Sequence, residues 1–253
     1  MLNTLNKYVR LRLNPMIRSL PAVKYIHLRQ LNKRINISSN PDFVHYRIPK
    51  AANSTIMRSI ANYDKNIDIS KKNNIADVKK KSYYNHPLNL GLKKSSHVLS
   101  DYFVFTFVRN PYDRVLSAYL DKIVHSNSKN HFITKRLNKK CYDEVSFNEF
   151  VDYLAKGGVN DNIHWSVQSS ILPPQQYLDY VGHVENLDDH LSEIIAFLFP
   201  DIYSFNVVYD LSHATKSREK YLEYYTPFLM NKVYEIYKED FERFGYDKRD
   251  VYL

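Results

Sequence analysis

The segment 103–119 constrains the fold of this chain more than any other, because it places an arginine where a buried strand turns into a helix. Residues 102–108 are apolar and aromatic almost without interruption, which is typical of a central parallel strand covered on both faces. Asn110 can cap the helix that follows, and Pro111 suits its first position. Unpaired amides and the positive end of the helix dipole then lie beside Arg109, which predicts an anion-binding site.

A second strand-to-helix corner lies upstream, in the segment 43–58. Lys50 follows the predicted strand, and small side chains with capping oxygens stand where a helix begins, at Asn53, Ser54 and Thr55. This corner predicts a phosphate-binding loop. It lacks the glycines of the nucleotide-binding pattern G-x-x-x-x-G-K-[ST], so an ordinary ATP or GTP site is disfavoured.

The two corners resemble the 5′- and 3′-phosphosulfate-binding motifs of sulfotransferases that use 3′-phosphoadenosine 5′-phosphosulfate (PAPS). Residues 49–55 are similar to the 5′ motif of the membrane-associated carbohydrate branch, sulfotransferase family 2, and residues 107–119 to its 3′ motif. Looser similarity occurs in the segments 164–168, 180–187 and 237–246, so the resemblance spans about residues 43–246.

The resemblance implies an α/β fold, a single P-loop-like domain with a central parallel sheet flanked by helices. It also implies transfer of a sulfuryl group from PAPS to a hydroxyl of a carbohydrate, with 3′-phosphoadenosine 5′-phosphate (PAP) as product and no metal. The implied 5′ loop comprises Lys50, Ala51, Ala52, Asn53, Ser54 and Thr55, in which Lys50 stabilises the leaving phosphate. Arg109 and Ser117 would bind the 3′-phosphate. Ser117 lies two turns inside the helix, where its hydroxyl can face the same anion as Arg109. Two interpretations are open for Lys216, Ser217 and Arg218. They either form a loop that closes over the 3′-phosphate or lie in a solvated turn.

The acceptor hydroxyl needs a base, and related enzymes place a histidine a little over twenty residues before the arginine. His86 lies 23 residues before Arg109 and is the preferred candidate, whereas His97 lies only 12 residues before it. His45 lies on the first predicted strand and is expected to point into the core or toward the edge of the sheet. A base other than His86 or His97 stays open.

Length and composition fit one enzyme domain, since 253 residues can bury a sizeable core. The chain has one cysteine, Cys141, and no apolar stretch long enough to span a bilayer. The carbohydrate branch in animals is usually anchored in the Golgi by an N-terminal membrane helix. This sequence departs from that pattern, and its single cysteine cannot form an internal disulfide, which indicates a reducing compartment. The sequence therefore predicts a cytoplasmic, bacterial protein, with the Golgi lumen as the alternative for a shortened chain.

The net charge of +9 is unevenly distributed. Residues 1–40 contain eight lysines and arginines and no acidic residue, which predicts a basic amphipathic extension broken at Pro15 and Pro21, ahead of a sulfotransferase domain at 41–253. This extension either packs on the domain or a partner subunit, or contacts a membrane peripherally. Further lysine-rich regions are expected on the rim of the domain and around the acceptor, at 65–94 and 122–140.

Two other functions compete with sulfuryl transfer. One is a P-loop-like kinase that uses ATP, and the other is a non-catalytic module that binds a polyanion or nucleic acid. A nucleic-acid partner is not expected, and the oligomeric state stays open. A helix is also predicted at 147–154, begun by a capping box of Ser146 with Glu149, and another at 187–199, capped by Asn186. A last helix is predicted from 226 onward, with further strands at 177–184 and 205–209.

Overall fold

The structure is a computed structural model that describes residues 2–64, 84–125, 131–140, 143–209 and 220–248. It divides into two compact units. The first unit contains Met1–Val108 and Ser170–Leu211, and the second contains Arg109–Ser169 and Ser212–Leu253.

A four-stranded sheet forms the centre of the first unit, in the order β1 (Ile35–Ser39), β2 (Asp42–Tyr46), β3 (Phe103–Val108) and β4 (Tyr180–His183). The last three strands run parallel, and β1 pairs antiparallel with β2. The predicted α/β fold with a central parallel sheet flanked by helices is confirmed, with the antiparallel strand β1 as the difference. The sequence did not predict β1, which lies inside the range assigned to the N-terminal extension.

The carboxyl ends of the three parallel strands share one edge of this sheet. Tyr46 of β2 lies opposite Thr106 of β3, and Val108 of β3 lies opposite His183 of β4. In parallel sheets this edge is where ligands bind. Because β2 and β3 run parallel, the chain leaves β2 toward Lys50 and leaves β3 toward Arg109 at the same edge.

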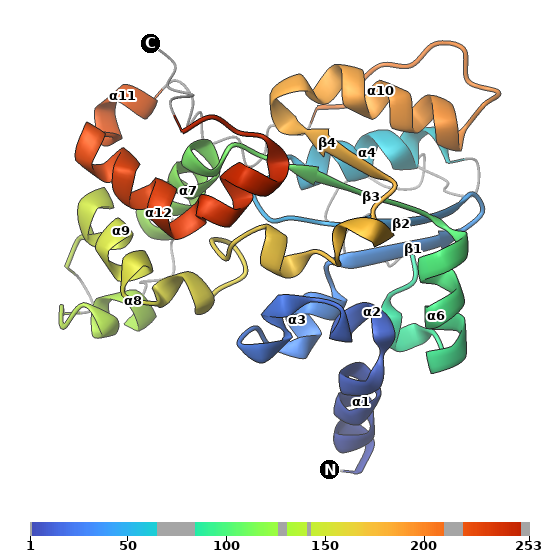
Figure 1. Cartoon of the computed structure of the whole chain (residues 1–253), viewed down its shortest axis with the longest axis horizontal. Helices are drawn as coiled ribbons and strands as arrows, with labels where there is room; N and C mark the ends of the chain where they lie inside the picture. Colours follow the sequence, from blue (N-terminus) through green and yellow to red (C-terminus); the bar gives the residue numbers. More distant parts are fainter. Residues whose placement is uncertain (1, 65–83, 126–130, 141–142, 210–219, 249–253) are drawn as a thin grey trace. The chain divides into compact units, whose positions relative to one another are not determined.

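Two helices, α4 (Asn53–Tyr63) and α10 (Leu187–Leu198), cover one face of the sheet (Figure 1). Their apolar side chains pack on rings of β2 and β3 in a core that includes Phe43, Phe105, Ile56, Ile60, Leu191 and Ile194. Gly182 allows β4 to lie close to the ring of Phe107 in β3, because a Cβ atom at residue 182 would lie 2.5 Å from that ring. Residue 182 must therefore be a glycine unless this ring moves.

The N-terminal residues form a series of short helices within the first unit. They form α1 (Leu2–Leu13), α2 (Pro15–Arg18), the 3-10 turn η1 (Pro21–Lys24) and α3 (Leu28–Asn32). The predicted breaks at Pro15 and Pro21 are confirmed. The amide of Asn14 donates to Pro87 O and Ser95 Oγ, which joins this segment to η2 (Pro87–Asn89) and α6 (Leu92–Asp101). The apolar residues buried there include Leu11, Met16, Ile17 and Leu20.

The second unit is helical and aromatic. It contains α7 (Pro111–Tyr119), the π-helical turn η3 (Leu120–Val124), α8 (His131–Arg136), α9 (Phe147–Ala155), η4 (Gly158–Asn160), α11 (Tyr221–Tyr224) and α12 (Pro227–Phe244). Helices α7, α9 and α12 pack around a core that includes Tyr112, Tyr119, Phe150, Trp165, Tyr237 and Phe241. The turns η6 (Gln175–Tyr177) and η7 (Val184–Asn186) belong to the first unit, and η5 (Ser169–Ile171) spans the boundary between the two units in the sequence.

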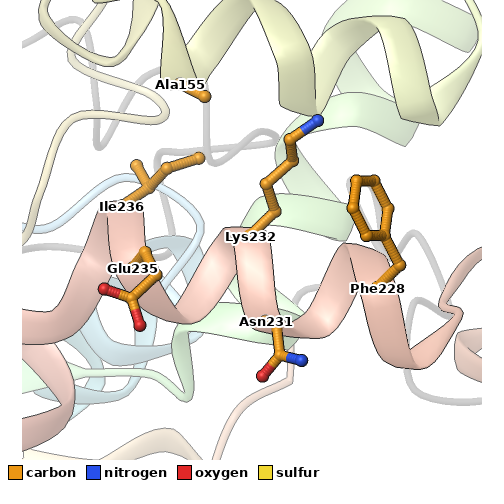
Figure 2. Close-up of a pocket in the computed structure, with 6 residues that line it drawn as sticks. All are labelled: Ala155, Phe228, Asn231, Lys232, Glu235 and Ile236. Carbon is orange, nitrogen blue, oxygen red and sulfur yellow. The ribbon is translucent and has the colours of Figure 1, made fainter.

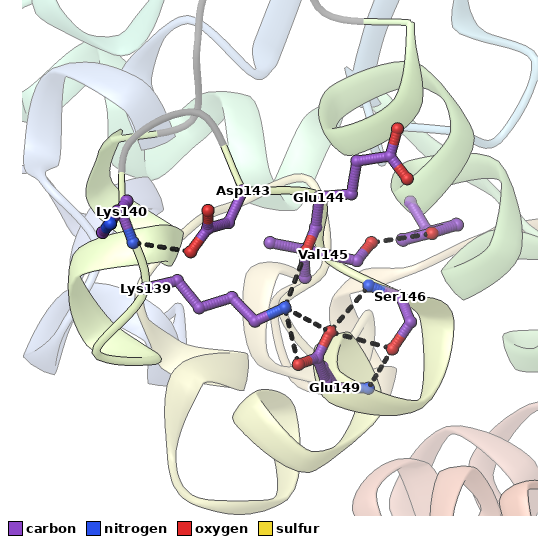
Figure 3. A network of polar contacts seen from close by, with 8 residues as sticks. Lys139, Lys140, Asp143, Glu144, Val145, Ser146 and Glu149 are labelled. Carbon is purple, nitrogen blue, oxygen red and sulfur yellow. Dashed lines mark hydrogen bonds and ion pairs between the residues drawn. The ribbon is translucent and has the colours of Figure 1, made fainter.

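Side-chain caps fix where several helices begin. Ser146 forms the predicted capping box with Glu149 at the start of α9, and Lys139 joins the Glu149 carboxylate (Figure 3). Thr226 caps α12 by accepting a hydrogen bond from the Leu229 amide. Asn186 precedes α10 but makes no capping bond, so that predicted cap is wrong.

The predicted strand at residues 205–209 is also wrong. The backbone amides of this segment donate to side chains rather than to a neighbouring strand. The Asn206 amide donates to Tyr63 Oη at 2.6 Å, and the Val208 amide donates to Ser59 Oγ at 2.9 Å. The segment therefore runs along α4 instead of extending the sheet.

Candidate functional site

The loop after β2 adopts a backbone conformation that residues other than glycine rarely adopt. Lys50 has φ of 68° and Ala52 has φ of 47°, both in the left-handed region. Such a residue costs about 1 kcal/mol or more, and strain of this kind concentrates at functional sites. The loop thus reaches a left-handed geometry without the glycines of an ordinary nucleotide-binding loop.

The amide groups of α4 follow this loop directly. Ala52 is the N-cap residue and α4 begins at Asn53, without a side-chain cap. The prediction that the side chains of Asn53, Ser54 and Thr55 cap the helix is therefore wrong at the N-cap position. The side-chain amide of Asn53 instead donates to Ile48 O, a bond within the loop. First-turn amides of a helix have no acceptor within the helix, so they suit an anion.

The corner after β3 forms as the sequence predicts. Asn110 Oδ1 accepts a hydrogen bond from the Tyr112 amide at 3.0 Å, and Pro111 occupies the first helical position of α7. The Arg109 guanidinium lies 4.0 Å from the Asp113 carboxylate, and 18% of its side chain is exposed. Arg109 thus stands at the start of a capped helix with its charge partly accessible.

Ser117, the predicted residue inside α7, is buried, and so is its neighbour Arg114. Ser117 is only 2% exposed. Arg114 is fully buried and donates to Ser166 O at 2.7 Å. Burial lowers the pKa of Arg114, while the neighbouring Tyr237 and Asp240 act in the opposite direction. Arg114 thus holds the chain segment that precedes Gln168.

His86 lies at the carboxyl edge of β2. Its Nδ1 atom is 2.8 Å from Ile35 O, and Ile35 pairs with Tyr46 at the end of that strand. A carbonyl oxygen only accepts, so Nδ1 carries the hydrogen and Nε2 of the neutral ring is left to accept a proton. Burial lowers the pKa of His86, the bond to Ile35 raises it, and the positive charges of Arg47 and Lys33 lower it.

The other two histidines lie in different surroundings. His97 is exposed on α6. His45 is fully buried, as predicted, and its ring stacks on Phe105 at a centroid distance of 4.5 Å. Burial lowers the pKa of His45 well below its usual value, so it is neutral in the fold.

Arg47 is a cation at this edge that the sequence interpretation did not select. It follows β2 directly, its amide donates to Arg34 O at 2.7 Å, and its guanidinium donates to Lys33 O. Burial, and next the charge of Arg34, lower its pKa to about 10. Its position directly after a strand was the available signal.

The second unit also has a shallow cavity of about 440 Å³ between α9 and α12, lined by Ala155, Phe228, Asn231, Lys232, Glu235 and Ile236 (Figure 2). Lys232 pairs there with Asp152 and lies 4.7 Å from the centre of the Phe228 ring. None of the predicted donor-binding residues lines this cavity. Lys216, Ser217 and Arg218 lie outside the described residues.

Comparison with known proteins decides the family. The model of the sulfotransferase family, Sulfotransfer_2, matches residues 33–247. The chain belongs to the sulfotransferase family. The predicted resemblance is confirmed, and its span agrees closely with the match.

Curated relatives include carbohydrate sulfotransferase 8 of Mus musculus, 29% identical over 174 residues that cover 60% of this chain and 42% of that protein. Carbohydrate sulfotransferase 11 of Rattus norvegicus is 30% identical, with 60% and 49% covered. Carbohydrate sulfotransferase 9 of Homo sapiens is 25% identical, with 87% and 54% covered. The chain thus spans about half the length of these relatives. No solved structure matches it.

The predicted location in a bacterial cytoplasm is wrong. The matching relatives are mammalian carbohydrate sulfotransferases, the branch that the resemblance links to the Golgi, and this conflicts with a cytoplasmic bacterial protein. Within the described ranges, no helix is both long and apolar enough to cross a membrane. The described part of the chain also has no group of three His, Cys, Asp or Glu side chains that could hold a metal ion. A reaction without a metal stays a prediction.

Proposed function

We propose that the chain transfers a sulfuryl group from PAPS to a hydroxyl of a carbohydrate. The observation that carries this proposal is the pair of strand-to-helix corners after β2 and β3, two neighbouring parallel strands, in a member of the sulfotransferase family. The names of the relatives support a carbohydrate as the acceptor. A kinase or a polyanion-binding module has no comparable support.

The two corners supply different contacts to the donor. The loop at Lys50 and the first amides of α4 bind the 5′-phosphosulfate, since a left-handed loop before a helix directs amides at an anion. Arg109, at the start of α7, binds the 3′-phosphate by charge-assisted hydrogen bonds, and Ser117 contributes its hydroxyl.

Lys50 promotes the transfer itself. The acceptor oxygen forms a bond to sulfur while the bond between sulfur and the 5′-phosphate oxygen breaks, and PAP leaves with the electron pair. The ammonium of Lys50 stabilises the negative charge that develops on that leaving oxygen. Its contribution is greatest in the transition state, so it acts on turnover more than on binding.

His86 accepts the proton of the acceptor hydroxyl. Support comes from its hydrogen bond to Ile35 O, which leaves Nε2 as the acceptor atom, and from a lowered pKa that keeps the ring neutral. The cations around it, Arg47 and Lys33, favour an anionic donor near this edge.

A peripheral membrane contact through residues 1–40 is part of the same proposal. On α1, Tyr8, Val9 and Leu13 are between 43% and 50% exposed, and the exposed Lys7 and Arg12 accompany them. Such a helix can lie on an anionic bilayer.

Turnover and product affinity of two variants test the proposed function together. Arg109→Ala should mainly weaken binding of PAPS and PAP, because it removes a contact present throughout the reaction. Lys50→Ala should reduce turnover with a carbohydrate acceptor far more than it reduces PAP affinity. Turnover that is unchanged in Lys50→Ala, or ATP turnover without PAPS, would contradict the proposal.

A further inference from the structure

The backbone of Arg109 is held by the side chain of one buried glutamine. The Arg109 amide donates to Gln168 Oε1 at 3.0 Å, and Gln168 Nε2 donates to Arg109 O at 2.9 Å. Both polar groups of the Arg109 peptide backbone are thus bonded to a single side chain. Gln168 has no exposed surface, and hydrogen bonds in such surroundings are stronger than in water.

A buried aspartate fixes the glutamine in turn. Asp240 lies in α12. One of its carboxylate oxygens accepts a hydrogen bond from the backbone amide of Gln168 at 2.7 Å, and the other accepts one from the backbone amide of Ser169 at 2.8 Å. Asp240 is fully buried, and bonds of this kind to a carboxylate are stronger than neutral ones. Burial raises its pKa, and the two amides act against that rise.

Two arginines hold the rest of this short segment. Arg114, in α7, donates to Ser166 O at 2.7 Å, and Arg243, in α12, donates to Ser169 O at 3.3 Å. The segment 166–169 is therefore attached to both α7 and α12. A glutamine held this firmly can fix the residue that it contacts.

Arg109 needs such support because it lies outside both the strand and the helix that flank it. Its backbone belongs neither to β3 nor to α7, so no ladder of regular hydrogen bonds restrains it. A binding residue contributes most when its neighbours hold it in the productive geometry before the ligand arrives. We infer that Gln168, supported by Asp240, is a positioning residue that orients Arg109 for the 3′-phosphate of the donor. This inference rests on the proposed function.

The test is a double-mutant cycle read by PAP affinity in isothermal calorimetry. Gln168→Met keeps the size of the side chain and removes both bonds to Arg109. We expect it to weaken PAP binding by roughly tenfold in the wild-type background, within the range of coupling between residues in contact. In the Arg109→Ala background the same change should weaken PAP binding no further, because the residue that Gln168 orients has lost its guanidinium.

Stability and binding are separated by a control in the same unit. Tyr153→Phe removes a hydrogen bond to Asp161 and should lower the melting temperature without changing PAP affinity. If Gln168→Met does not fold, Gln168→Glu replaces it, since a carboxylate keeps one bond to the Arg109 amide and opposes the Arg109 carbonyl oxygen. Tenfold losses in both backgrounds, or none in either, would overturn the positioning role while the donor assignment stands. A wild-type chain that does not bind PAP would overturn both.

Discussion

His86 shows how one hydrogen bond can prepare a side chain for a reaction. The Ile35 carbonyl fixes the tautomer, and burial lowers the pKa, so the proposed base is neutral with its Nε2 atom ready to accept a proton. His97 is exposed on α6 and His45 is buried in the core. Spacing along the sequence selected His86, but its tautomer depends on a strand 51 residues away.

Replacing the proposed base tests this assignment. His86→Asn keeps an amide that can still donate to Ile35 O but removes the base, so sulfate transfer should fall by roughly 10² to 10⁴. PAP affinity and melting temperature should stay near the wild-type values. The wild-type rate should fall on acidification only below pH 6.5, because the pKa of His86 is lowered from that value. The measurement is the transfer rate as a function of pH.

His97→Asn provides the matched control for this substitution. It should leave the rate and its pH dependence unchanged, because His97 is an exposed side chain on α6. A fully active His86→Asn beside an inactive, folded His97→Asn would reverse the two assignments.

At the scale of elements, local signals predicted the helix starts better than the loops. Pro111 and Asn110 predicted the start of α7, and the pair Ser146 and Glu149 predicted that of α9. The loop before α4 has no such signal, because lysine and alanine give no indication of a left-handed backbone. Its conformation follows from the packing of α4 on the sheet and from the Asn53 bond to Ile48 O.

The left-handed loop predicts the sign of a stability change. Ala52→Gly should raise the free energy of unfolding by about 0.5–1 kcal/mol, since relief of the left-handed backbone exceeds the added freedom of the unfolded chain. Ala51→Gly is the control, because Ala51 is buried and is not among the residues with positive φ, so this change should destabilise. Urea unfolding measures both. Equal destabilisation by the two glycines would contradict the left-handed conformation at Ala52.

At the scale of the whole molecule, the sequence predicted the structural features that residues close together in the sequence determine. The antiparallel strand β1 was missed because it was read as part of the basic extension, although Ile35 and Ile37 alternate with polar residues at the period of a strand. Gln168 belonged to a segment of loose family similarity, but its contact with Arg109 joins residues 59 positions apart. Such pairings follow from the tertiary fold and not from local pattern.

The buried His45 should make the stability of the fold depend on pH. Its folded pKa is lowered below 6.5, so the unfolded chain binds a proton in acid that the folded chain does not. The contribution of His45 to the free energy of unfolding is fully present above pH 6.5. Below that pH the free energy of unfolding falls by up to about 1.4 kcal/mol per pH unit for one proton. His45→Phe should remove this part of the slope in urea unfolding between pH 7 and pH 5, whereas His97→Asn should not. An unchanged slope in His45→Phe would contradict a neutral His45.

The central claim is that the folded chain binds the adenosine nucleotide of a sulfate donor, and thermal unfolding with PAP or with ATP tests it most directly. A ligand that binds only the folded chain stabilises it by about 2.7 kcal/mol at a hundredfold excess over its dissociation constant. PAP should therefore raise the melting temperature, and ATP should raise it much less. An equal response to both nucleotides, or none to either, would contradict the account.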